Sequence, residues 1–199
     1  MSFDLAASLR SLKPQKVRTI SRRPDDDLDF ADGSTPLDGP PLLLDSCVYI
    51  DVLKGEAPGF LRDILNARQC NHSSVCLAEM VHPFGRLDPP HFDFRHKSTK
   101  AALAAITAVI AREIPPHRVA APDVDLWCDA GILAGSLFRA RGYGKERQQA
   151  CLNDALIYLQ AAKSGLMVLT RNVGDFDVLN QLAPRGRILL YRTVGAGKQ

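Results

Sequence analysis

Four acidic residues lie far apart along the chain, and each stands beside a short apolar segment. If a fold gathers such carboxylates, their charge needs a cation, and carboxylate and water oxygens are the ligands that Mg²⁺ and Mn²⁺ prefer. Carboxylates around an ion of this kind can form a hydrolytic site for phosphodiesters. The four residues are Asp45, Glu79, Asp154 and Asp175.

The segments around these acids predict strands that alternate with helices. Such alternation is typical of an α/β sandwich around a mostly parallel sheet, in which ligands bind at the carboxyl ends of the strands. Asp45 follows the apolar run 42–44, and Asp175 lies just beyond the strand predicted at 167–170. Asp154 is expected in the first turn of a helix that Asn153 caps, and Glu79 one turn into another helix. All four can therefore line one edge of the sheet.

Composition bounds the organisation of the chain. With 199 residues, of which 46% are hydrophobic and 24% charged, the chain can form one domain with one core. The net charge of +3 permits a polyanionic partner without indicating one. Residues 1–40 are rich in Pro, Gly, Arg and Asp, so we expect a flexible N-terminal extension before a domain at 41–199.

Cysteine usage and hydropathy bear on location. The five cysteines form no CxxC pair and no zinc-ligand spacing, which is typical of small buried thiols in a reducing compartment. No hydrophobic signal segment begins the chain, and the longest apolar stretch, 101–111, is too short to cross a bilayer. We therefore expect a cytoplasmic protein without a membrane partner.

Four stretches of the chain resemble the PIN-domain ribonucleases, especially the VapC-type toxins of bacterial toxin–antitoxin systems. Each stretch is short, but their order and spacing match the family, and the resemblance extends from about residue 41 to residue 192, which is about three quarters of the chain. The resemblance implies a PIN-like α/β/α sandwich. The stretches are LLLDSCVYID (42–51), SSVCLAEM (73–80), NDALIY (153–158) and VLTRNVGDF (168–176).

The resemblance also implies a role for each site residue. Asp45 and Asp154 would hold Mg²⁺ or Mn²⁺, Glu79 would ligate it directly or through water, and Asp175 would support this metal or a second, weaker one. Many relatives carry an acid where this chain has Asn172, whereas others have Asn there and the acid three residues later, as here. Residues expected to orient the carboxylates are Ser46, Thr170 and Asn172.

The implied activity is a metal-dependent endoribonuclease that leaves 5′-phosphate and 3′-hydroxyl ends. The implied partners are RNA, a small antitoxin that inserts a helix into an apolar groove, and a second copy of the chain in a homodimer. Arg171 and Lys145 are the candidate RNA contacts, and Asp51 is expected to be a solvated acid. Two alternatives stay open: a housekeeping PIN nuclease of RNA maturation, and a catalytically silent PIN-fold module that binds RNA or protein.

Overall fold

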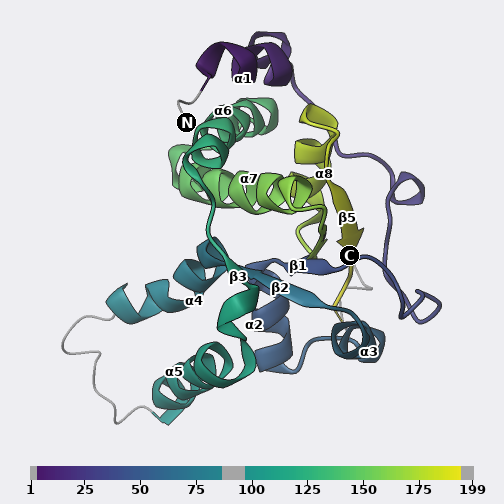
Figure 1. The fold of residues 1–199 in the computed structure, drawn as a ribbon, viewed down its shortest axis with the longest axis vertical. Helices are drawn as coiled ribbons and strands as arrows, with labels where there is room; N and C mark the ends of the chain where they lie inside the picture. The colour runs from purple at the N-terminus through teal and green to yellow at the C-terminus, as the bar shows by residue number, and fades with distance from the viewer. Residues whose placement is uncertain (1–3, 87–96, 194–199) are drawn as a thin grey trace.

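A five-stranded parallel sheet forms the centre of the protein, whose computed structural model describes residues 4–86 and 97–193 (Figure 1). The strand order is β3-β2-β1-β4-β5, so β1 is central. Leu42–Leu44 of β1 pair with residues 70–72 on one side and with residues 167–169 on the other. The strands are β1 (Leu42–Leu44), β2 (Cys70–Ser73), β3 (Val119–Ala120), β4 (Met167–Thr170) and β5 (Arg187–Leu190).

Helices cover both faces of the sheet, which confirms the predicted α/β/α sandwich. α6, α7 and α8 lie on one face, and α2, α3 and α5 lie on the other (Figure 1). α4 packs against both α2 and α7. No helix among the residues described is long and apolar enough to cross a lipid bilayer. The helices are α1 (Leu5–Leu12), α2 (Ser46–Lys54), α3 (Gly59–Ala67), α4 (Ser74–Arg86), α5 (Lys97–Ala108), α6 (Val124–Arg141), α7 (Gln148–Lys163) and α8 (Val173–Leu182).

One helix boundary differs from the one that the sequence predicts, and another helix contains a proline. α7 begins at Gln148, so Asn153 lies inside the helix and is not its N-cap. α4 continues through Pro83, although proline lacks the N–H that would donate to the carbonyl of Glu79. Val81 and Pro83 are exposed, so water can satisfy the freed carbonyl on that side of the helix. Both features affect the site, because Asn153 and Glu79 face each other across the two helices.

The N-terminal extension lies against the domain along α6, α8 and β5. α1 packs on α6, and residues 29–31 pair with the edge strand. The Ala31 amide donates to the Leu190 carbonyl at 2.7 Å, and the Leu190 amide donates to the Asp29 carbonyl at 2.8 Å. The extension thereby continues the hydrogen bonding of the sheet beyond β5.

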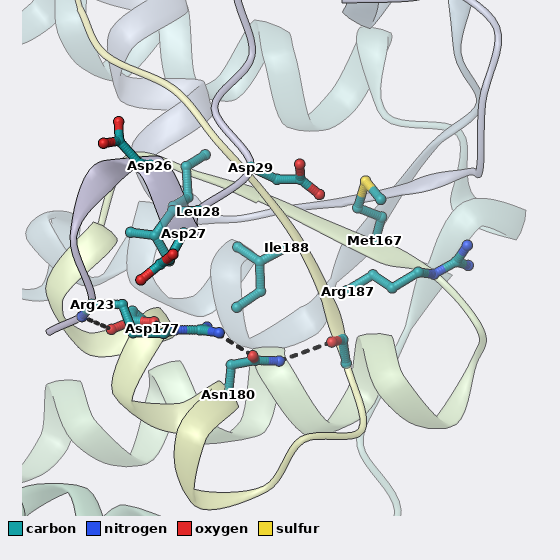
Figure 2. Close-up of a pocket in the computed structure, with 12 residues that line it drawn as sticks. Arg23, Asp26, Asp27, Leu28, Asp29, Met167, Asp177, Asn180, Arg187 and Ile188 are labelled. Atoms are coloured by element: carbon teal, nitrogen blue, oxygen red, sulfur yellow. Dashed lines mark hydrogen bonds and ion pairs between the residues drawn. The ribbon is translucent and has the colours of Figure 1, made fainter. Parts of the chain in front are cut away.

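An arginine of the extension is held by buried polar groups of α8. Arg23 Nε donates to Asp177 Oδ1 at 2.6 Å, and its backbone N–H donates to Asp177 Oδ2 at 2.8 Å. A terminal nitrogen of Arg23 also donates to Asn180 Oδ1 at 3.0 Å. Figure 2 shows these groups at one end of a pocket of about 510 Å³ between the extension and β5. Because Asp177 is only 1% exposed, Arg23 supplies the counter-charge that its burial requires.

We expect Arg23→Ala to lower the free energy of unfolding by about 1–3 kcal/mol, because the change strips a buried carboxylate of its partner. The arginine is itself partly exposed, which limits the loss. Urea denaturation followed by circular dichroism measures the change. The matched control is Arg22→Ala, which removes an exposed pair with Asp25 and should cost less than about 1 kcal/mol.

Equal, small losses in the two variants would mean that the contact between Arg23 and Asp177 contributes little to stability. That result would agree with the mobility expected from the composition of residues 1–40, which stays a prediction.

Candidate functional site

Asp45 lies at the carboxyl end of the central strand and caps the N-terminus of α2. Its carboxylate accepts the Ser46 amide at 2.7 Å and the Thr170 hydroxyl at 2.6 Å, the latter from the neighbouring strand β4. The Ser46 hydroxyl is 3.4 Å from the same carboxylate. Asp45 is only 4% exposed, because three fully or nearly fully buried leucines precede it. The position of this acid is therefore fixed by the core of the sheet.

Glu79 approaches the same edge from α4. Its carboxylate accepts the Asn153 side-chain amide at 2.6 Å, and Gln149 donates to the oxygen of that amide at 2.9 Å. Burial raises the pKa of Glu79, and the nearby charge of Asp45 raises it further, whereas the bonds from Asn153 and Ser46 lower it. The displacement of the start of α7 thus gives Asn153 a role that the sequence does not reveal: it orients Glu79.

Asp154 follows Asn153 on α7 and faces the other acids. Burial raises its pKa well above the usual range, and the charges of Asp45, Asp175 and Glu79 raise it further. Arg147 acts in the opposite direction. Asp154 is 9% exposed and accepts the Asn172 side-chain amide at 3.0 Å. The fold therefore brings the four predicted acids so close that the charges of the other three raise the pKa of Asp154.

Asp175 differs from the other three acids because protein cations already contact it. Arg147 donates to Asp175 Oδ2 at 2.8 Å, the Tyr143 hydroxyl donates to Oδ1 at 2.5 Å, and Arg141 Nε lies 3.9 Å away. Asn172 caps α8 with its side-chain oxygen and lies 3.4 Å from Asp175 Oδ2 through its side-chain nitrogen. Asp175 is therefore a compensated charge, and Asn172 bridges it to Asp154.

A pocket of about 540 Å³ opens at the carboxyl ends of β1 and β4 and gives access to this cluster. This is the place at which open parallel sheets bind ligands. Asp45 and Asp154 face it, and arginines lie at its rim. The residues that line it are Asp45, Ser46, Cys47, Arg147, Ala150, Asp154, Arg171, Asn172, Val173 and Gly174.

The basic residues around the pocket are arranged differently from the expectation. Arg171 lines the pocket, but its Nε is 2.9 Å from Asp51 Oδ2. The expectation that Asp51 is solvated is wrong: the residue is fully buried and also accepts the Tyr191 hydroxyl at 2.7 Å. Lys145 lines a separate groove between α6 and α7. Arg147 is the rim cation that contacts the acids, and only the fold reveals its contact with Asp175.

Two thiols also belong to this cluster. Single oxygen atoms of Asp45 and Glu79 and the sulfur of Cys76 all lie within 4.8 Å of one another. Cys47 Sγ donates to Asp45 Oδ2 at 3.1 Å. The sequence does contain a signal for Cys76, since a residue three positions before Glu79 lies on the same face of a helix. Cys76 belongs to no CxxC pair and to no zinc-finger spacing, so those patterns do not indicate it.

Comparisons with known proteins give structural likeness alone. No protein-family model and no curated protein matches the chain. The chain is similar to a chain of the DNA-bound VapBC complex from Salmonella typhimurium, with 22% identity, a TM-score of 0.44, and coverage of 75% of this chain and 97% of the other. It is also similar to a chain of VapBC2 from Rickettsia felis bound to a promoter DNA fragment, with 14% identity, a TM-score of 0.40, and coverage of 74% and 96%. Since these scores are low, we base the functional proposal on the residues of this chain, whose sequence resembles the VapC-type PIN domains.

Proposed function

We propose that this protein is a metal-dependent endoribonuclease of the PIN-domain, VapC type. The observation that carries the proposal is the convergence of two buried carboxylates, Asp45 and Asp154, and the partly buried carboxylate of Glu79 at the carboxyl end of β1. Burial and the nearby charge of Asp45 raise the pKa values of Glu79 and Asp154, so the cluster favours the binding of protons or of a cation. The order of the acids in the four resembling stretches supports the same reading.

The donor set fits the proposed ion. Carboxylate oxygens suit Mg²⁺ and Mn²⁺, which are commonly held by one to three carboxylates together with water. Asp45 and Asp154 would hold the ion, and Glu79 would ligate it directly or through water. When bound, Mg²⁺ or Mn²⁺ acidifies a water molecule and offsets negative charge at the phosphorus of the substrate.

The other residues of the chain orient these ligands. Thr170 and Ser46 hold the Asp45 carboxylate, and Asn153 holds that of Glu79. Such contacts reduce the rotational freedom that ion binding would otherwise remove. We assign Asp175 an indirect role: it positions Arg147, whose guanidinium lies at the rim where an RNA phosphate would enter.

We further propose an antitoxin and a second copy of the chain as partners. Ile50 and Leu53 of α2 and Val81 of α4 are large apolar side chains left exposed. An amphipathic helix of a small antitoxin would cover apolar side chains along α2 and α3, the groove that the resemblance implies. A basic side chain of that partner would neutralise the acids of the pocket.

Cleavage of total cellular RNA tests the activity. We expect discrete products with Mg²⁺ or Mn²⁺ and none with EDTA. Asp45→Asn should reduce the rate at least about 100-fold, because residues that merely orient metal ligands already contribute about 10–100-fold. The matched control is Asp63→Asn, which changes an exposed acid on α3 and should leave the rate unchanged. If no metal supports cleavage by wild-type protein, the protein is a silent binding module.

Thermal and urea unfolding of the metal-free protein test the charge cluster. The folded pKa of Asp154 is raised, so the native state binds more protons than the unfolded state does. Stability should therefore fall as the pH rises from about 4 through the folded pKa. Asp154→Asn removes this loss, and at pH 7 we expect it to stabilise the metal-free protein by about 1–3 kcal/mol.

Added Mg²⁺ should reverse the order of stability of these two proteins. It should stabilise the wild type by about 4.1 kcal/mol when its concentration is 1,000 times the Kd, which exceeds the advantage of Asp154→Asn, and should have little effect on that variant. If Asp154→Asn destabilises the metal-free protein at pH 7, the carboxylates do not repel one another as described.

The contacts of Asp175 predict a milder phenotype for its substitution. We expect Asp175→Asn to raise the KM for RNA more than it lowers kcat, because Arg147 loses its charged partner while Asp45, Glu79 and Asp154 remain. Steady-state cleavage of a short RNA measures both constants. A loss of kcat as large as that of Asp45→Asn would show that Asp175 is a direct metal ligand.

A further inference from the structure

Cys76 stands one turn before Glu79 on α4 and faces the same carboxylates. Its side chain is fully buried, and its thiol donates to the Leu44 carbonyl at 3.3 Å, which is the carbonyl directly before Asp45. The sulfur lies within 4.8 Å of carboxylate oxygens of both Asp45 and Glu79, and these oxygens lie within the same distance of each other. Three donor atoms from two elements therefore form one triangle.

This triangle combines one sulfur with two oxygens, and that mixture has a different metal preference from an all-oxygen site. Mg²⁺ and Mn²⁺ prefer oxygen, whereas Zn²⁺ accepts Cys, Asp and Glu together. Bonds of about 2.3 Å to sulfur and about 2.0–2.2 Å to oxygen in a tetrahedron separate the donors by roughly 3.3–3.7 Å. The sides of the observed triangle are at most 4.8 Å long, so they must shorten by at most about 1.1–1.5 Å, which side-chain rotations can supply.

A second thiol lies beside the same carboxylate on the side of the pocket. Cys47 Sγ is 3.1 Å from Asp45 Oδ2 and belongs to the lining of the pocket. The backbone amide of Arg171 also points at this sulfur, at 3.3 Å. Asp45 is thus flanked by Cys76 within the core and by Cys47 at the pocket, so a sulfur is close to a fourth ligand position.

We propose that the protein binds Zn²⁺ through Cys76, Asp45 and Glu79, with Cys47 or water as the fourth ligand. Ligation by Cys76 replaces its S–H bond by a Zn–S bond and releases the proton to solvent. Because the site shares Asp45 and Glu79 with the Mg²⁺ site, Zn²⁺ excludes Mg²⁺ and inhibits cleavage. The inhibition rests on the proposed nuclease function, whereas Zn²⁺ binding rests on the donor atoms alone.

Cadmium is the probe for the test, since Cd²⁺ replaces Zn²⁺ at such sites and its bond to a thiolate absorbs in the ultraviolet. Metal-free, full-length protein titrated with Cd²⁺ should develop this band at one equivalent, and Zn²⁺ should displace it. Cys76→Ser should remove about half of the band if Cys47 is the fourth ligand and all of it if water is, and should weaken Zn²⁺ binding at least about tenfold, while Mg²⁺ binding stays within about threefold of the wild type. The matched control is Cys128→Ser on α6, which should behave as the wild type.

An unchanged band in Cys76→Ser, or its loss in Cys128→Ser, would overturn the proposed ligand set. Circular dichroism and thermal unfolding establish that each variant is folded. If Cys76→Ser does not fold, X-ray absorption of Zn²⁺-loaded wild type decides instead: a sulfur at about 2.3 Å supports the site, and a shell of oxygen and nitrogen alone refutes it.

The zinc site and the nuclease activity can fail independently in these experiments. RNA cleavage with Mg²⁺ but no thiolate band would remove the zinc site and leave the nuclease. A thiolate band that depends on Cys76, without cleavage by any metal, would keep the zinc site and remove the nuclease.

Discussion

The placement of like charges at the end of a buried strand is the constraint on which the rest of the structure depends. Asp45 is tied to β1, whose leucines are almost completely buried, and Asp154 is tied to α7, most of whose residues are buried. A fully buried leucine contributes about 1.5–3 kcal/mol of hydrophobic stabilisation. Several such residues in each element hold the carboxylates together against their repulsion. The core therefore fixes a site that is electrostatically unfavourable when it holds no cation.

The acids divide according to how their charge is compensated. Asp175 is neutralised by Arg147 and supported by the Tyr143 hydroxyl, so its charge is balanced within the protein. Among the residues that the structure describes, the donors to Asp45 and Glu79 are neutral: Thr170, Ser46, Cys47 and Asn153. Neutral hydrogen bonds orient a carboxylate but do not cancel its charge. A cation, either a metal ion or a basic side chain of a partner, would therefore gain most binding free energy beside Asp45 and Glu79.

Residues that follow buried strands were predictable from the sequence, and residues that depend on packing between helices were not. The run 42–44 identifies both a central strand and the acid at its end, and the alternating segments give the parallel sheet. By contrast, α7 begins at Gln148, before Asn153, with no side-chain cap hydrogen bond, and it packs along α6. No local cap signal in the sequence indicates this start.

The partner of a charged side chain is likewise a matter of tertiary structure. Asp51 is one of many acids by sequence, and its burial follows from the approach of Arg171 and Tyr191, which lie far away in the chain. Arg147 lies beside Asp175, and Cys76 lies beside Asp45, for the same reason. Each contact joins segments that are far apart in the sequence. Spacing along the chain carries no information about such contacts between elements.

The two arginines at the rim explain why a cation would matter for substrate binding as well as for catalysis. Arg171 is paired with buried Asp51, and Arg147 is paired with buried Asp175, so each guanidinium is largely offset by its own partner. The pocket between them therefore keeps the negative charge of Asp45, Glu79 and Asp154. In the proposed nuclease, a phosphodiester entering that pocket would be repelled until an ion offset most of the local negative charge. The arginines would then act as fixed hydrogen-bond donors that orient the phosphate, and the ion would supply the attraction.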